Sequence, residues 1–144
     1  MASKIGRNVK KYPKYLRSTH DIITASYNAF KKHYDEIEFE KLIKFDLEFE
    51  GKEFCTIVPK NTKEIIIEGV NNNNCLGSYV EKVIKGETYI IFMRRNDEKE
   101  NSLITLEFRN GKIVQYKGQY NREPNEEEME FIESYCKIKD IKLI

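Results

Sequence analysis

A single cysteine follows a run of four asparagines and precedes a segment with helical spacing. Asparagine forms neither helices nor strands readily, so the run at 71–74 predicts a break in regular structure. Cys75 would then lie where a helix begins, and the partial positive charge of a helix N-terminus lowers the pKa of a thiol placed there. Two interpretations of Cys75 follow: a reactive thiol on a polar loop, or a small buried hydrophobic residue.

Other residues could join this thiol in a catalytic or ligand-binding pocket. The candidate catalytic residues are Cys75, Tyr79, Arg94 and Glu107, which offer a nucleophile, a hydroxyl, a cation and a carboxylate. The candidate binding amides are Asn74, Gln115 and Asn121. The simpler alternative is structural: Tyr79 lies in the core, and Arg94 and Glu107 form an ion pair with each other.

Charge is concentrated near both ends of the chain. The first 17 residues mix basic and aromatic side chains, as segments that bind phosphates and bases do, and their candidate binding residues are Lys10, Lys11 and Arg17. Near the other end, Glu127 and Glu130 belong to a carboxylate-rich helix that could occupy a basic groove on a partner protein. The alternatives are a solvated arm and a helix whose acidic first turn suits the helix dipole.

Composition limits the class of protein. The 144 residues predict one domain, and a hydrophobic fraction of 40% is sufficient for a packed core. A net charge of +1 argues against a generic polyanion-binding surface. Three cysteines without a CxxC pair and two histidines match no common zinc pattern, so we expect no metal and no cofactor. Without an apolar run of membrane-spanning length or a signal peptide, we expect a cytoplasmic protein.

Hydrophobic periodicity predicts the elements that must position these residues. The expected helices are 19–35, a short one from the capping residue Asn61 to Gly69, 75–85 and 125–137. The expected strands are a hairpin over 45–58 that turns at residues 51–52, a central strand over 88–94, and a hairpin of 103–109 with 112–117. The last residues, 138–144, form a final strand or lie on the core.

Two registers follow from these turns. A tight turn at 51–52 pairs Phe49 with Phe54. A two-residue turn at 110–111 pairs residue 109 with 112 and 108 with 113, and places Glu107 opposite Val114. It also puts Gln115 opposite Leu106, among apolar side chains.

The expected fold class is therefore α+β. It consists of a mostly antiparallel sheet of four to six strands with three to four helices packed on one face. We expect residues 1–17 to form a basic arm and residues 18–144 to form one domain.

The order and spacing of one set of residues in this chain resemble the sequence pattern of PcfJ-like proteins, which conjugative plasmids and phages encode. The matching positions are 12–16, 19–21, 68–69, Cys75, Gly77, Tyr79, 86–94, 105–107, Gln115, Gly118 and Asn121. The resemblance covers most of the chain. It departs at one point, because family members commonly have His-His before the cysteine where this chain has Asn73-Asn74.

The resemblance implies a protein of a mobile genetic element. We expect it to act by binding rather than by catalysis, as an inhibitor of a host defence nuclease such as a CRISPR effector would. Its partner would be a host or mobile-element protein, or a nucleoprotein complex, an expectation that rests on genomic context. Two alternatives stay open: a cysteine-dependent enzyme or small-ligand-binding domain centred on Cys75, and a nucleic-acid-binding protein that uses the basic arm.

Overall fold

The computed structural model describes residues 35–74 and 79–144. The strands are Phe49–Glu50 (β1), Phe54–Ile57 (β2), Tyr89–Arg95 (β3), Ile104–Arg109 (β4), Lys112–Lys117 (β5) and Lys142–Leu143 (β6). The helices are Thr62–Asn71 (α2), Tyr79–Ile84 (α3) and Glu126–Lys139 (α4), with short 3-10 turns at Phe45–Leu47 (η1) and Gln119–Asn121 (η3). Residues 35–40 are also helical, so the described helix extends past residue 35, where the predicted helix 19–35 ends.

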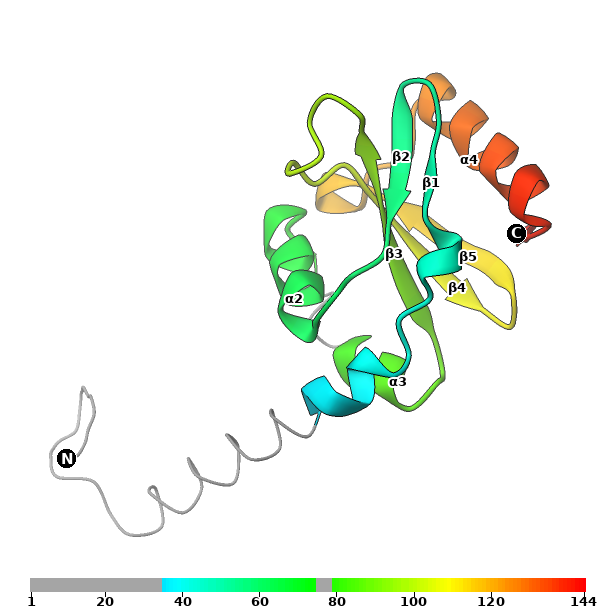
Figure 1. The fold of residues 1–144 in the computed structure, drawn as a ribbon. Helices are drawn as coiled ribbons and strands as arrows, with labels where there is room; N and C mark the ends of the chain where they lie inside the picture. Colours follow the sequence, from blue (N-terminus) through cyan, green and yellow to red (C-terminus); the bar gives the residue numbers. More distant parts are fainter. Residues whose placement is uncertain (1–34, 75–78) are drawn as a thin grey trace, which may run out of the picture. The chain divides into compact units, whose positions relative to one another are not determined.

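Within the described residues the strands form one sheet in the order β1-β2-β3-β4-β5-β6 (Figure 1). Neighbouring strands are antiparallel, except that β6 runs parallel to β5. The α+β class, the mostly antiparallel sheet and a final strand near the C-terminus are confirmed. The basic arm and the predicted helix up to residue 34 lie outside the described residues, so the predicted boundary at residue 17 stays a prediction.

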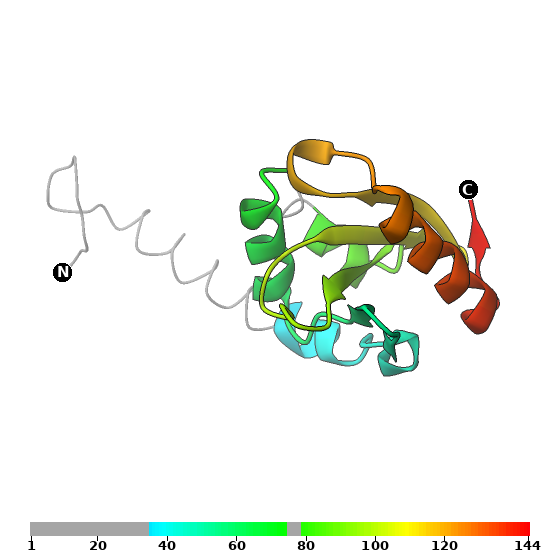
Figure 2. The same ribbon diagram turned by 90° about the horizontal axis from the view of Figure 1, so that it is seen from above.

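The central strand β3 is buried on both faces, as its apolar sequence predicts. On one face, Arg94 binds Glu68 of α2. On the other face, the Phe54 ring of neighbouring β2 lies 5.6 Å from the Phe131 ring of α4. The helices α2 and α3 therefore cover one face and α4 covers the other (Figure 2), so the predicted packing of all helices on one face is not what the structure has. A strand that is apolar on both sides requires this double cover.

The first hairpin forms, but its register differs from the predicted one. Phe49 lies opposite Thr56, so the predicted pairing of Phe49 with Phe54 is wrong. The reason is a longer turn, which the Gly51 N–H closes by donating to the carbonyl oxygen of Phe54 over 2.8 Å. Residues 45–47, predicted as strand, form η1, and the Leu47 carbonyl accepts a hydrogen bond from the Thr56 hydroxyl.

The second hairpin turns at Asn110-Gly111 as predicted, with positive φ at both residues. The pairs next to the turn are also those predicted, 109 with 112 and 108 with 113. A β-bulge then shifts the register, so Glu107 lies opposite Gln115 and not opposite Val114. Leu106 correspondingly lies opposite Tyr116, and the prediction that Gln115 lies opposite it is wrong.

The helix ends follow local capping chemistry. Asn61 caps α2, as predicted, by accepting a hydrogen bond from the Glu64 N–H over 3.0 Å. The helix runs past Gly69 to Asn71, two residues beyond its predicted end. At α4, Asn125 and Glu128 form a capping box. Residues 75–78 of the predicted helix 75–85 lie outside the described residues.

Among the residues that the structure describes, no helix has the length and apolarity needed to span a membrane.

Truncation of the Phe92 side chain tests the double-sided core. Phe92 is buried in the core cluster, so Phe92→Ala should lower the free energy of unfolding by about 3–5 kcal/mol, because it opens a cavity. Urea denaturation measures this loss. Val70→Ala is the control: Val70 is 70% exposed, and its truncation should change stability by less than about 0.5 kcal/mol. Equal midpoints for Phe92→Ala and the wild type would contradict the core assignment.

Candidate functional site

A pocket of about 280 Å³ lies over the face of the sheet that α2 and α3 cover. Its walls come from the asparagine run, the first residue of α3, the strands β3 to β5 and the turn η3. The lining residues are Asn73, Asn74, Tyr79, Ile90, Thr105, Glu107, Gln115, Lys117 and Asn121. Most of these side chains carry hydrogen-bonding groups, so the pocket suits a polar ligand.

The β-bulge creates the wall that the sheet contributes. Thr105 and Glu107 point to the same face of β4 because they are two residues apart. Beyond the bulge, Gln115 lies opposite Glu107 and Lys117 lies opposite Thr105. Four polar side chains thus meet on one face of the sheet. Without the register shift, Val114 would take the place of Gln115.

Glu107 is the buried carboxylate of the pocket, with 5% of its surface exposed. Its Oε2 accepts hydrogen bonds from the Thr88 hydroxyl over 2.7 Å and from Arg109 Nε over 3.0 Å. Its Oε1 accepts no hydrogen bond from any residue that the structure describes, and it is not sealed from solvent. This oxygen is available to a donor group of a ligand. The ion pair predicted between Arg94 and Glu107 is wrong.

Exposed amides surround this carboxylate. Gln115 and Asn121 are exposed, and neither side chain makes a hydrogen bond with another residue in the described parts of the chain. Asn121 has φ of 61°, a left-handed conformation that asparagine tolerates better than most residues. Each amide has both a donor and an acceptor to offer a ligand. The structure thus brings together five of the predicted site residues: Asn74, Tyr79, Glu107, Gln115 and Asn121.

The two charged residues of the lining are each paired. Glu107 forms an ion pair with Arg109, and Lys117 forms one with Glu123 at the end of the same loop. The pocket therefore presents no uncompensated charge from its described lining residues.

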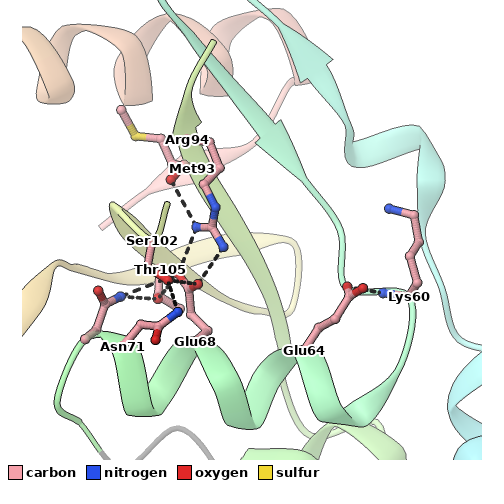
Figure 3. A network of polar contacts seen from close by, with 9 residues as sticks. Lys60, Glu64, Glu68, Asn71, Met93, Arg94, Ser102 and Thr105 are labelled. Carbon is pink, nitrogen blue, oxygen red and sulfur yellow. Dashed lines mark hydrogen bonds and ion pairs between the residues drawn. The ribbon is translucent and has the colours of Figure 1, made fainter. Parts of the chain in front are cut away.

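Arg94 lies beside the pocket in a buried network around Glu68 (Figure 3). Its two terminal nitrogens donate to the two carboxylate oxygens of Glu68 over 3.0 and 2.6 Å. The hydroxyls of Ser102 and Thr105 also donate to this carboxylate, over 2.8 and 3.1 Å. Glu68 is 1% exposed and Arg94 is 8% exposed. The predicted catalytic candidate Arg94 is a partner in this ion pair and does not line the pocket.

The same network fixes the two loops that frame the pocket. Asn72, 2% exposed, lies one turn after Glu68, and its amide nitrogen is 3.4 Å from Glu68 Oε2. The Asn72 carbonyl accepts a hydrogen bond of 2.8 Å from the Tyr120 N–H. This bond joins the asparagine run to η3, so the loop that contains Asn73 lies beside the turn that contains Asn121. Thr105 belongs to both the network and the pocket lining.

A second ion pair holds the chain that follows η3. Arg122 donates to both carboxylate oxygens of Glu128 over 2.9 and 3.0 Å. Burial would raise the pKa of Glu128, but hydrogen bonds from Arg122 and from the Asn125 N–H together hold that pKa below its ordinary value. A Cβ atom at Gly118 would lie 3.0 Å from the Arg122 side chain and 3.0 Å from the Leu103 carbonyl oxygen, so a larger residue would require these neighbours to move.

The other predicted site residues lie apart from the pocket. Glu127 and Glu130 are exposed on α4, on the opposite face of the sheet. Cys75, Lys10, Lys11 and Arg17 lie outside the described residues.

The two cysteines in the described part of the chain are unsuited to nucleophilic chemistry. Burial raises the pKa of Cys55, and it raises the pKa of Cys136 to about 11, so both thiols are protonated at neutral pH. Over residues 35–74 and 79–144, no cluster of three or more histidine, cysteine or acidic side chains could hold a metal ion.

Glu68 is among the positions that match the family, but the roles of Glu68 and Asn72 in the buried network were not predicted from the sequence. Both continue the stripe of α2 that begins with buried Ile65, at spacings of three and four residues. A carboxylate on the core-facing stripe of a helix is a signal for a buried ion pair, since an unpaired charge there would be too costly. That signal was present in the sequence, although it does not identify the partner.

Loss of the Glu68 carboxylate should be strongly destabilising. Glu68→Ala leaves Arg94 buried without a counter-charge, so we expect a loss of about 3–5 kcal/mol in the free energy of unfolding. The double variant Glu68→Ala/Arg94→Met should recover part of this loss. Glu50→Ala, which breaks the exposed pair with Lys99, is the control and should cost less than about 1 kcal/mol. Chemical denaturation measures all three variants, and equal losses for Glu68→Ala and Glu50→Ala would contradict the assignment.

Comparisons with known proteins identify the family. The family model of PcfJ-like proteins matches residues 1–133. An uncharacterised protein of Listeria innocua is 36% identical over 124 residues, which cover 82% of this chain and 27% of the relative. The chain thus spans only about a quarter of the length of this relative. No solved structure matches the chain. Because the family model covers nearly all of its residues, the chain belongs to the PcfJ-like protein family.

Proposed function

We propose that this domain binds a small polar molecule in the pocket between the asparagine run, α3 and the sheet. The observation that carries the proposal is the meeting of free hydrogen-bonding groups at one place. Glu107 Oε1 and the amides of Gln115 and Asn121 find no partner among the described residues, and all three side chains line the pocket. Convergent polar groups in a concave site are typical of ligand recognition.

The family resemblance supports the same pocket. Tyr79, Thr105, Glu107, Gln115 and Asn121 all belong to the set of residues by which the chain resembles PcfJ-like proteins. The exposed amides of Gln115 and Asn121 do not hold the described fold together. Polar loop and edge residues that a chain shares with its family without a role in packing favour a functional interpretation.

The residues that replace the family's His-His favour binding over catalysis. Asn73 and Asn74 both line the pocket. An imidazole can exchange protons near neutral pH, whereas an amide only donates and accepts hydrogen bonds. A pocket with amides at these positions keeps its capacity for recognition and loses one means of acid–base catalysis. We therefore place ligand binding ahead of a cysteine-dependent reaction at Cys75.

A variant whose pocket is filled by a larger side chain tests the proposal. We expect one or more neutral polar metabolites to raise the melting temperature of the wild-type chain in a thermal-shift screen. Gln115→Trp places a bulky side chain at an exposed position of the pocket wall, so it should abolish this shift while the fold is kept. Gln119→Ala, an exposed residue of η3 outside the lining, is the control. A shift that survives Gln115→Trp would locate the ligand elsewhere and contradict the proposal.

A second candidate function is protein binding through α4. Its exposed face carries four carboxylates: Glu126, Glu127, Glu130 and Glu133. Such a row can complement a basic groove of a partner, for example the nucleic-acid channel of a defence nuclease. Inhibition of such a nuclease by a plasmid- or phage-borne protein is the form of this function that we favour.

Charge reversal on α4 tests this second candidate. Glu127→Lys/Glu130→Lys should abolish capture of a nuclease from a lysate of a strain that carries one, with little change in stability because both side chains are exposed. Glu98→Lys/Glu100→Lys makes the same charge change in the exposed β3–β4 loop and should leave capture intact. Capture is read by mass spectrometry. Equal capture by both variants would rule out the acidic face as the contact.

A further inference from the structure

We propose that the ligand of the pocket is a nucleobase, carried either by a free nucleoside or by single-stranded nucleic acid. The inference rests on the proposed function of the pocket and names its ligand class. Three properties of the site support it: its charge, its hydrogen-bonding pattern and its apolar surfaces.

The charge of the lining favours a neutral ligand. Glu107 and Lys117 are the charged residues among the described lining, and each already has a partner, Arg109 or Glu123. A charged ligand group would lose hydration in the pocket without gaining an unpaired counter-charge, and that loss is costly. Nucleobases are uncharged at neutral pH.

The hydrogen-bonding groups match the edge of a base. A base edge presents donors and acceptors side by side in one plane. Glu107 Oε1 can accept from a ring N–H or an exocyclic amine, as carboxylates do when they read bases. Opposite it, the amide of Gln115 can both donate and accept, and the amide of Asn121 adds a further pair of groups. Bases that are not paired in a duplex expose these edges for recognition.

The remaining surfaces suit the faces of a flat ring. Ile90, 1% exposed, contributes an apolar side chain from the central strand, and Tyr79 contributes an aromatic ring from α3. Bases pack their faces on such groups, whereas sugar hydroxyls would leave the apolar floor unused. The volume of about 280 Å³ lies near the lower end of the roughly 300–1,000 Å³ of small-molecule sites, which suits one nucleoside better than a large cofactor.

Calorimetric titration of the full chain tests the inference. The probes are adenosine, guanosine, cytidine and uridine, and single-stranded homo-oligonucleotides of the same four bases. We expect saturable binding of at least one base, with an affinity that falls about three- to tenfold in Gln115→Ala, the effect of losing one hydrogen bond. Gln119→Ala is the matched control and should bind like the wild type. Binding of the nucleoside identifies the free ligand, and Gln115-dependent binding of the oligonucleotide alone identifies the strand; either supports the inference.

Three outcomes would overturn it. Binding of nucleosides or oligonucleotides that Gln115→Ala leaves unchanged would place the base outside the pocket, for example on the basic arm. If neutral sugars or amides bind with Gln115 dependence and no base does, the ligand class is wrong while the proposed function stands. If no probe binds and the thermal-shift screen also finds no ligand, the inference fails together with the proposed function.

Discussion

The buried ion pair between Glu68 and Arg94 is the interaction on which the rest of the structure depends. Removing two charges from water is costly, and the cost is offset only when every polar atom of the pair finds a partner. Here the Glu68 carboxylate accepts hydrogen bonds from both terminal nitrogens of Arg94 and from the hydroxyls of Ser102 and Thr105. The carboxylate belongs to α2, and its donors come from β3, from the segment that leads into β4 and from β4 itself. The requirement to satisfy one carboxylate therefore fixes the helix against the sheet.

The pocket is a consequence of that fixed arrangement. Glu68 orients Asn72, and the Asn72 carbonyl holds the Tyr120 N–H, so the loops before α3 and after β5 are joined. The β-bulge supplies the other wall by turning Gln115 toward Glu107. Binding residues on loops gain precision when a rigid scaffold positions them. The network and the bulge provide that scaffold on one face of the sheet, while α4 stabilises the opposite face.

Local signals predicted most elements but not how they meet. The Asn61 cap, the Asn110-Gly111 turn and the apolar strand β3 each have a short-range cause, and the structure has them where the sequence predicts them. The bulge was not predictable, because Val114 fits a regular strand and no residue near it signals a register shift. The partner of Arg94 was assigned incorrectly since its carboxylate lies 26 residues away on a helix. Five of the pocket residues were predicted as site residues from the sequence, whereas Ile90 and Lys117 were not, and the convergence of all of them required the tertiary structure.

Hydrogen exchange at the Tyr120 amide tests most directly the claim that the Glu68 network holds the pocket together. In the wild type, the bond from this N–H to the Asn72 carbonyl oxygen should protect it from exchange even though Tyr120 is 73% exposed. In Glu68→Gln, the account predicts much faster exchange at Tyr120 while the amide of Leu106 in β4 keeps its protection. Unprotected exchange at Tyr120 in the wild type, or equal protection in both proteins, would contradict it.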